Sequence, residues 1–453
     1  MNLTSPNNSR KIQDLLLNRV EGISWFYYNV DLNTALGGKE EIYATQSQVE
    51  KFMEDIDSDI FGKNKMKPGT KERGTTEILQ FLATIIKANP KVLEDVIRRL
   101  FDVNEIRNQS DAGEGLLGKF NNKDRAVRNS IYTERIRNDH REKKGNIVVL
   151  AEGDSWFQFP TAYFGIDGVK DILDWLIEDE RYAVRSLAAG GDWFSNIFHS
   201  GEYIEELPKV SPDVFLVSGG GNDLVGNRRL ALMVINPKYE TPAADDCDQS
   251  KRLIELRSQI EGIDIKKYKL GLRYLSEEFF NFLNVYFIQF FVFFVSLSDA
   301  KQYKHMLMIT QGYDFTLPYN GSRAYFPAMQ YIFSRFTDTG GWLFDPLKMK
   351  GIVKVDVQEA IMYAMITEFN EMLQQLATYE GLPNLFHIDC RGVARNEDDW
   401  FDELHPQSET FEVIAKAYKA CMEENVGFVE KRKGKKKKKV YLARTYRAKA
   451  KAK

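Results

Sequence analysis

Short runs of β-branched and other apolar residues recur in the second half of the chain, and most of them end abruptly in small or polar residues. There are five such runs, at 146–155, 182–192, 213–223, 305–314 and 385–390. Amphipathic helical patterns separate or follow them, at 168–180, 357–380 and 408–420. Buried parallel strands are apolar on both faces and need crossover helices between them. The alternation therefore predicts an α/β fold in which helices cover both faces of a five-stranded parallel sheet.

The first third of the chain has a different pattern. Residues 76–103 carry apolar side chains at helical spacing, interrupted at Pro90, and 104–144 is polar, as in a linker or a solvated helix. We therefore expect three parts. They are a mainly helical accessory region at 1–144, a domain at 145–427 with a polar insertion at about 228–275, and a basic tail at 428–453. The insertion could serve as a lid or a substrate wall.

Composition and charge narrow the class of protein. With 43% hydrophobic and 28% charged residues among 453, the chain is neither collagen-like, nor a coiled coil, nor wholly disordered. Three cysteines without a CxxC pair exclude a disulfide framework and disfavour structural zinc. Residues 431–453 hold 13 Lys or Arg and no acid, so the net charge of −3 conceals an acidic body and a basic tail. The tail is either disordered and solvated or binds nucleic acid or an anionic membrane surface.

The ends of the predicted strands carry the candidate chemistry, because open parallel sheets bind ligands beyond their carboxyl edge. The first strand leads to Ser155, the second to Gly191 and the third to Asn222. Beyond the fifth strand, Asp402 precedes His405 by three residues. A serine nucleophile needs an imidazole base, the imidazole needs a carboxylate, and an oxyanion needs N–H donors. Together these residues supply what acyl transfer requires.

The same residues resemble the sequence blocks of the SGNH (GDSL-type) hydrolase family over about 145–425. The matching blocks are GDS at 153–155, GGD at 190–192, GGND at 220–223 and DELH at 402–405. The resemblance implies a flavodoxin-like α/β/α sandwich. It also implies a triad of Ser155, His405 and Asp402, with an oxyanion hole formed by the Ser155 and Gly191 backbone N–H groups and the Asn222 side chain. Trp156 and Trp193 depart from the family pattern and would narrow or flatten the acyl site.

These observations lead us to expect a serine ester hydrolase that works through an acyl-enzyme and needs no metal or organic cofactor. The substrate would be a small-molecule, glycan or lipid ester. Two alternatives stay open: an acyltransferase with the same triad, and a non-catalytic binding protein with an anion-binding tail. The N-terminal residues lack the long apolar run of a secretory signal, so we expect a cytoplasmic location. The oligomeric state is not predicted.

One apolar segment is close to membrane-spanning length. Residues 279–297 form 19 consecutive positions without a charge, which fits either a transmembrane helix or a buried helix packed on the sheet. A single crossing would place Ser155 and His405 on opposite sides of a bilayer. Because we expect those residues to act together, we predict a buried helix and no membrane span. The aromatic segment also weakly favours apolar acyl chains.

Overall fold

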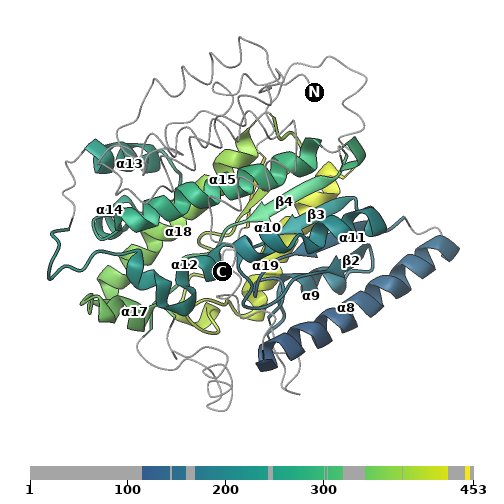
Figure 1. Ribbon diagram of the computed structural model, residues 1–453, viewed down its shortest axis with the longest axis horizontal. Coiled ribbons are helices and arrows are strands. Elements are labelled where there is room, and N and C mark those ends of the chain that lie inside the picture. Colours follow the sequence, from purple (N-terminus) through teal and green to yellow (C-terminus); the bar gives the residue numbers. More distant parts are fainter. Residues whose placement is uncertain are drawn as a thin grey trace, which may run out of the picture. The chain divides into compact units, whose positions relative to one another are not determined.

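The centre of the protein is a parallel β-sheet flanked by helices. The computed structural model describes residues 115–142, 145–159, 169–242, 248–299, 301–303, 305–319, 342–379, 381–426 and 444–448. All neighbouring strands are parallel, in the order β2-β1-β3-β4-β5-β6. Figure 1 labels β2, β3 and β4 of this sheet. The strands are β1 Ile147–Glu152, β2 Tyr182–Ser186, β3 Val214–Val217, β4 Leu307–Gln311, β5 Leu385–Asp389 and β6 Thr445–Arg447. The predicted α/β class with a parallel sheet is confirmed.

The sheet has one strand more than the five predicted. Strand β6 comes from the segment that was expected to be a disordered basic tail, and its residues pair with β5. Tyr446 lies against Phe386, and its hydroxyl donates to Glu424 at 2.5 Å and accepts from Asn425 at 2.8 Å. The surrounding run of lysines concealed the short strand. The rest of the basic segment, 427–443 and 449–453, lies outside the described residues, as does the helical pattern at 76–103.

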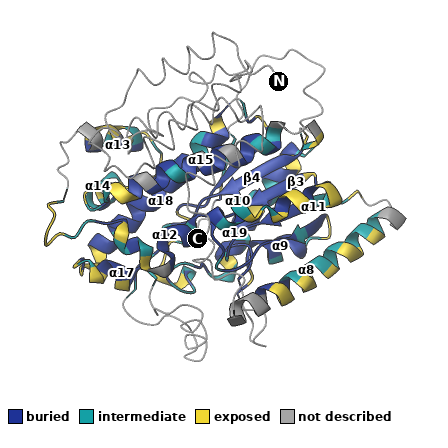
Figure 2. Cartoon of the chain, in the orientation of Figure 1, coloured by how far each residue is buried: buried dark blue, intermediate teal, exposed yellow. Residues whose placement is uncertain are grey.

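Helices cover both faces of the sheet. Helix α9 lies in the connection from β1 to β2, and α11 lies in the connection from β2 to β3. These two connections run in opposite directions along the sheet, so right-handed crossovers place α9 and α11 on opposite faces. Helix α19 packs against α9. In Figure 2, β3 and β4 have the dark blue colour of buried residues. Apart from α8 and α15, which are considered below, the described helices are α9 Ile172–Ile177, α10 Phe194–Ser200, α11 Glu202–Val210, α12 Gly221–Val225, α13 Asp248–Ser258, α14 Ile265–Leu272, α17 Phe344–Met349, α18 Val355–Thr378 and α19 Ser408–Asn425. The 3-10 turns near them are η4 Gly226–Leu232 and η6 Glu397–Asp399.

Helix α8, Gly115–Glu142, lies along the outer edge of β2 (Figure 1). The Asn129 side chain replaces a neighbouring strand there, because its Nδ2 donates to the Ser186 carbonyl at 3.0 Å and its Oδ1 accepts from the Ser186 N–H at 2.9 Å. Arg135 donates to the Tyr182 carbonyl at 2.6 Å. The sequence of this stretch predicts a linker or a solvated helix because it lacks an apolar stripe. The helix packs through polar side chains because the surface that it covers consists of peptide groups.

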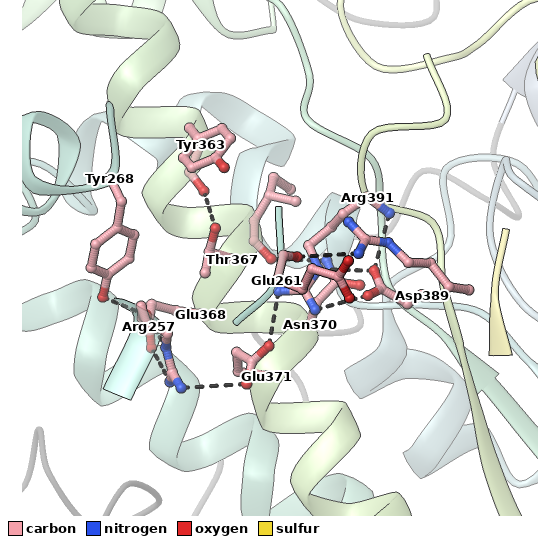
Figure 3. Close-up of polar contacts among 12 residues, drawn as sticks. Arg257, Glu261, Tyr268, Tyr363, Thr367, Glu368, Asn370, Glu371, Asp389 and Arg391 are labelled. Atoms are coloured by element: carbon pink, nitrogen blue, oxygen red, sulfur yellow. Dashed lines mark hydrogen bonds and ion pairs between the residues drawn. The ribbon is translucent and has the colours of Figure 1, made fainter. Parts of the chain in front are cut away.

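A buried charged cluster fixes the insertion at 228–275 to α18 (Figure 3). Arg257 of α13 makes two 2.8 Å bonds to Glu368 of α18, and the Tyr268 hydroxyl of α14 donates to the same carboxylate at 2.5 Å. Glu371 accepts from Arg257 at 3.3 Å and from Arg391 at 2.9 Å. Removing one member of such a cluster strands a buried charge, which typically costs about 3–5 kcal/mol. The cluster therefore defines where α13 and α14 lie on α18.

The predicted apolar helix at 279–297 is α15, Glu277–Asp299, in a second compact unit with η5 Lys301–Tyr303 and residues 375–383. Aromatic rings stack on one another along the helix; the ring centroids of Phe282 and Tyr286, for example, are 4.2 Å apart. Phe291 lies against Tyr379. By length and composition α15 could cross a membrane, and 87% of its most apolar window is buried. Such burial is typical of a helix in a protein core. The absence of a membrane span stays a prediction.

A buried histidine on β5 makes the stability of the fold depend on pH. His387 is fully buried, and neither ring nitrogen has a hydrogen-bond partner among the described residues. Burial lowers its pKa to about 4, with Asp389 opposing and Arg391 reinforcing the shift. The unfolded chain has the ordinary histidine pKa near 6.5. The contribution of the neutral His387 ring to the free energy of unfolding is therefore complete above that pH and is lost as the pH falls towards 4.

We therefore expect His387→Leu to reduce the loss of stability on acidification. This one group should account for about 2 kcal/mol of the decline in unfolding free energy between pH 8 and pH 5. Urea denaturation of both proteins at each pH measures the difference. An identical decline in the wild type and the variant would contradict the prediction.

Candidate active site

The sequence-predicted site residues follow successive strands at one edge of the sheet. Ser155 comes after β1, Gly191 after β2 and Asn222 after β3, within the first turn of α12. The strand order reverses between β1 and β3. In open α/β sheets this reversal leaves a crevice beyond the carboxyl ends of the strands, where ligands bind. Ser155 and Asn222 flank that position.

Ser155, His405 and Asp402 form a continuous hydrogen-bonded chain. His405 Nε2 lies 2.7 Å from Ser155 Oγ, although 250 residues separate them in the sequence. On the other side of the ring, His405 Nδ1 lies 2.8 Å from Asp402 Oδ2 and 2.9 Å from Oδ1. The imidazole is buried, and Phe159 packs against its face with ring centroids 4.4 Å apart. This is the geometry that a base-activated hydroxyl nucleophile requires.

The local sequence of the 400–406 loop creates the Asp–His pair. Asp402 Oδ1 accepts the backbone N–H groups of both Leu404 and His405 at 2.7 Å, which closes a tight turn over the three-residue spacing. Trp400 and Pro406 form an antiparallel bridge that closes the loop. Burial alone would raise the pKa of Asp402, but His405 and the backbone donors outweigh burial and lower it. The carboxylate is therefore held in its charged form beside the ring.

Glu403, which sequence analysis passed over, anchors this loop. Its carboxylate accepts the backbone N–H groups of Tyr319, Trp342, Leu343 and Phe344 at 2.6–2.9 Å. Burial raises the pKa of Glu403 despite these donors. One side chain therefore fixes the 400–406 loop to Tyr319 and to the start of α17. The position of Glu403 between Asp402 and His405 was the only sequence signal for this role.

Two of the three expected oxyanion donors have no acceptor among the residues that the structure describes. Neither the Ser155 nor the Gly191 backbone N–H has a hydrogen-bond partner among the described residues. Gly191 has a φ of 83°, a conformation that side chains other than glycine's rarely tolerate. Asn222 Nδ2 donates to the Asp192 carbonyl at 2.9 Å, which uses one amide hydrogen and ties the second loop to the third. The three donors thus lie on connected loops.

A buried polar network holds the residue that precedes Ser155. Asp154 Oδ2 accepts from the Tyr313 hydroxyl at 2.5 Å, and Oδ1 accepts from Ser218 at 2.9 Å. Tyr313 in turn accepts the Gly221 N–H at 2.9 Å. Burial raises the pKa of Asp154, and the bonds from Tyr313, Trp156 and Ser218 oppose that shift. Tyr313 therefore connects the residue before Ser155 with the residue before Asn222.

An apolar pocket opens beside the Ser155–His405 pair. Ser155, Asn222 and His405 lie in its lining, and the empty space including the open mouth is about 490 Å³. Most of the remaining wall is apolar and comes from Trp156, Leu224, Val225, Met362, Ile366, Phe369 and Leu404. Met362, Ile366 and Phe369 follow helical spacing on one face of α18.

The structure also locates residues whose roles the sequence left open. Trp156 lines the pocket, where its indole N–H donates to the Leu404 carbonyl at 3.2 Å. Trp193 is buried under Arg229 and is absent from the pocket lining. None of the described residues of the 228–275 insertion lines the pocket. Among the described residues no cluster of His, Cys, Asp or Glu could hold a metal ion.

Comparison with known proteins gives little further information. No family model matches the chain, and no curated protein matches it. Among solved structures the chain is similar to a crystal structure described as that of a GDSL-like lipase from Parabacteroides merdae, with 11% identity and a TM-score of 0.31. The match covers 62% of this chain and 96% of that one. A likeness of this size carries no argument about function.

The network beneath Ser155 predicts the effect of removing one hydroxyl. Tyr313→Phe removes the hydrogen bond to the buried Asp154 Oδ2 and the acceptor of the Gly221 N–H, while Ser218 and Trp156 still donate to Asp154 Oδ1. We therefore expect the free energy of unfolding to fall by about 2–3 kcal/mol. Tyr418→Phe is a matched control, because Tyr418 donates only a neutral bond at 2.9 Å to Gln311, and it should cost about 1 kcal/mol. Urea denaturation compares the two variants. Equal losses would contradict the role assigned to Tyr313.

Proposed function

We propose that this protein is a serine ester hydrolase that acts through an acyl-enzyme. The observation that carries the proposal is the chain of contacts from Ser155 Oγ to His405 Nε2 at 2.7 Å and from His405 Nδ1 to Asp402 at 2.8 Å. Two backbone N–H groups without acceptors among the described residues, and an apolar pocket at the same point, support it. An ordinary turn serine needs none of these features.

The proposed reaction has two steps. His405 Nε2 takes the Ser155 Oγ proton while Oγ bonds to the ester carbonyl carbon, and the carbonyl oxygen becomes an oxyanion. The Ser155 and Gly191 N–H groups and the Asn222 amide would donate to that oxyanion. The tetrahedral intermediate collapses as the C–O bond breaks and the imidazolium returns its proton to the leaving alcohol. Water then repeats the sequence, with His405 as base, and releases the acid.

The pocket lining favours an ester with an apolar acyl group. Its wall is formed mainly by aliphatic and aromatic side chains. Among the described residues that line it, the only acidic or basic side chains are those of Asp154 and His405. Asp154 is already engaged by Tyr313 and Ser218. An apolar chain buried there gains about 0.8 kcal/mol per methylene group.

Mutation of the nucleophile is the first test. Ser155→Ala should lower the hydrolysis of short p-nitrophenyl esters by about 10⁴-fold or more, because no other hydroxyl contacts His405 Nε2 among the described residues. A fluorophosphonate probe should label the wild type and not the variant. An unchanged Tm controls for folding. Full activity in Ser155→Ala would remove Ser155 from the nucleophile role, and product analysis with added alcohols would reveal acyl transfer.

Acyl-chain preference is the second test. Ile366 lines the pocket from α18, so Ile366→Phe should shorten the space for the chain. We expect kcat/KM for a hexanoyl ester to fall about tenfold or more relative to that for an acetyl ester, since each lost methylene contact is worth about 1 kcal/mol or more. The acetyl ester serves as the internal control. An unaltered ratio would place the acyl group elsewhere.

A further inference from the structure

The peptide that carries the Gly191 N–H is held by a side chain from α8. Asn121 Nδ2 donates to the Gly190 carbonyl at 3.0 Å, and Asn121 Oδ1 accepts the Gly190 N–H at 2.9 Å. The Asn121 side chain is buried, with 2% of the residue exposed. The Gly190 carbonyl and the Gly191 N–H belong to one planar, trans peptide unit, so they point in opposite directions. Fixing the carbonyl against Asn121 therefore directs the Gly191 N–H away from α8.

The same side chain reaches the loop of the nucleophile. Gln158, three residues after Ser155, donates to the Asn121 carbonyl at 2.9 Å and to Asn121 Oδ1 at 3.1 Å. Gln158 is fully buried. Asn121 thus joins two loops, each of which supplies one of the backbone donors proposed for the oxyanion.

Asparagine suits this position because its amide has the donor and the acceptor of a peptide group. Asn129 makes the same two bonds to Ser186, at 3.0 and 2.9 Å. Ser186 lies inside β2, where pairing with β1 already fixes the backbone. Gly190 lies beyond the end of the strand and has no ladder partner. The side chain of Asn121 therefore performs at Gly190 what strand pairing performs at Ser186.

We propose that Asn121 is a positioning residue for the oxyanion hole, supplied by the N-terminal part of α8. The inference rests on the proposed function. Asn121 itself contacts no reacting atom; it acts through the Gly190–Gly191 peptide. Loss of its amide frees that peptide to rotate, which weakens a donor that matters most when charge develops on the substrate oxygen.

The test compares Asn121→Ala with Asn129→Ala in the full chain. Both variants remove one asparagine amide that pairs with one residue's N–H and C=O, and Asn121→Ala also removes the bond from Gln158 to Asn121 Oδ1. Both should therefore lower Tm, Asn121→Ala by at least as much as Asn129→Ala. Only Asn121→Ala should lower kcat for a p-nitrophenyl ester, by about 10- to 100-fold with KM within twofold, because a misplaced donor affects the transition state more than the bound substrate. The rate of fluorophosphonate labelling of Ser155 should fall in parallel.

The outcomes separate this inference from the proposed function. If the wild type hydrolyses esters and both variants lose kcat equally, or neither does, the inference is overturned and the triad stands. If the wild type is neither active nor labelled, both proposals are overturned. Should Asn121→Ala fail to fold, Asn121→Asp with Asn129→Asp as its control decides. Asp keeps the size of the side chain but places an acceptor against the Gly190 carbonyl, so kcat should again fall only at position 121.

Discussion

The structure depends on one constraint, the alignment of parallel strands that end at a common edge. That alignment places Ser155 and Asn222 on either side of the point where the strand order reverses. His405 is brought there by a loop, and the 2.7 Å contact with Ser155 depends on how firmly that loop is held. Glu403 supplies the anchor with four backbone bonds. The network around Asp154 holds the serine side of the contact.

Helix α18 connects two features that are distant in the sequence. Met362, Ile366 and Phe369 line the pocket from one face, whereas Glu368 and Glu371 belong to the charged cluster with Arg257. Glu368 follows Ile366 by two residues, and Glu371 follows Phe369 by two. Such positions lie about 200° apart around the helix axis, so the pocket and the cluster occupy opposite faces of α18. The insertion at 228–275 therefore supports the pocket wall from behind without lining it. Its polar sequence suits an ion-paired surface better than a lid.

The sequence predicted those parts of the fold that depend on apolar periodicity. Five strands and the helices α9, α18 and α19 follow directly from such patterns. The placement of Ser155, Asp402 and His405 together was predicted from residue types at strand ends. What escaped prediction is held by polar side chains on backbone groups. Such contacts leave no period in the sequence, and this explains why α8 looked like a linker and why Glu403 drew no attention. Strand β6 was concealed by the charge of its neighbours.

Helix α8 also bears on how the protein can be divided. A boundary drawn from composition at residue 144 would separate α8 from the sheet that it borders, although both belong to one compact unit. Without α8, the outer N–H and C=O groups of β2 would face solvent as an unpaired strand. Unprotected strands of this kind recruit strands from other molecules. A shortened chain that begins at Gly145 should consequently self-associate, even though every residue of the triad is still present.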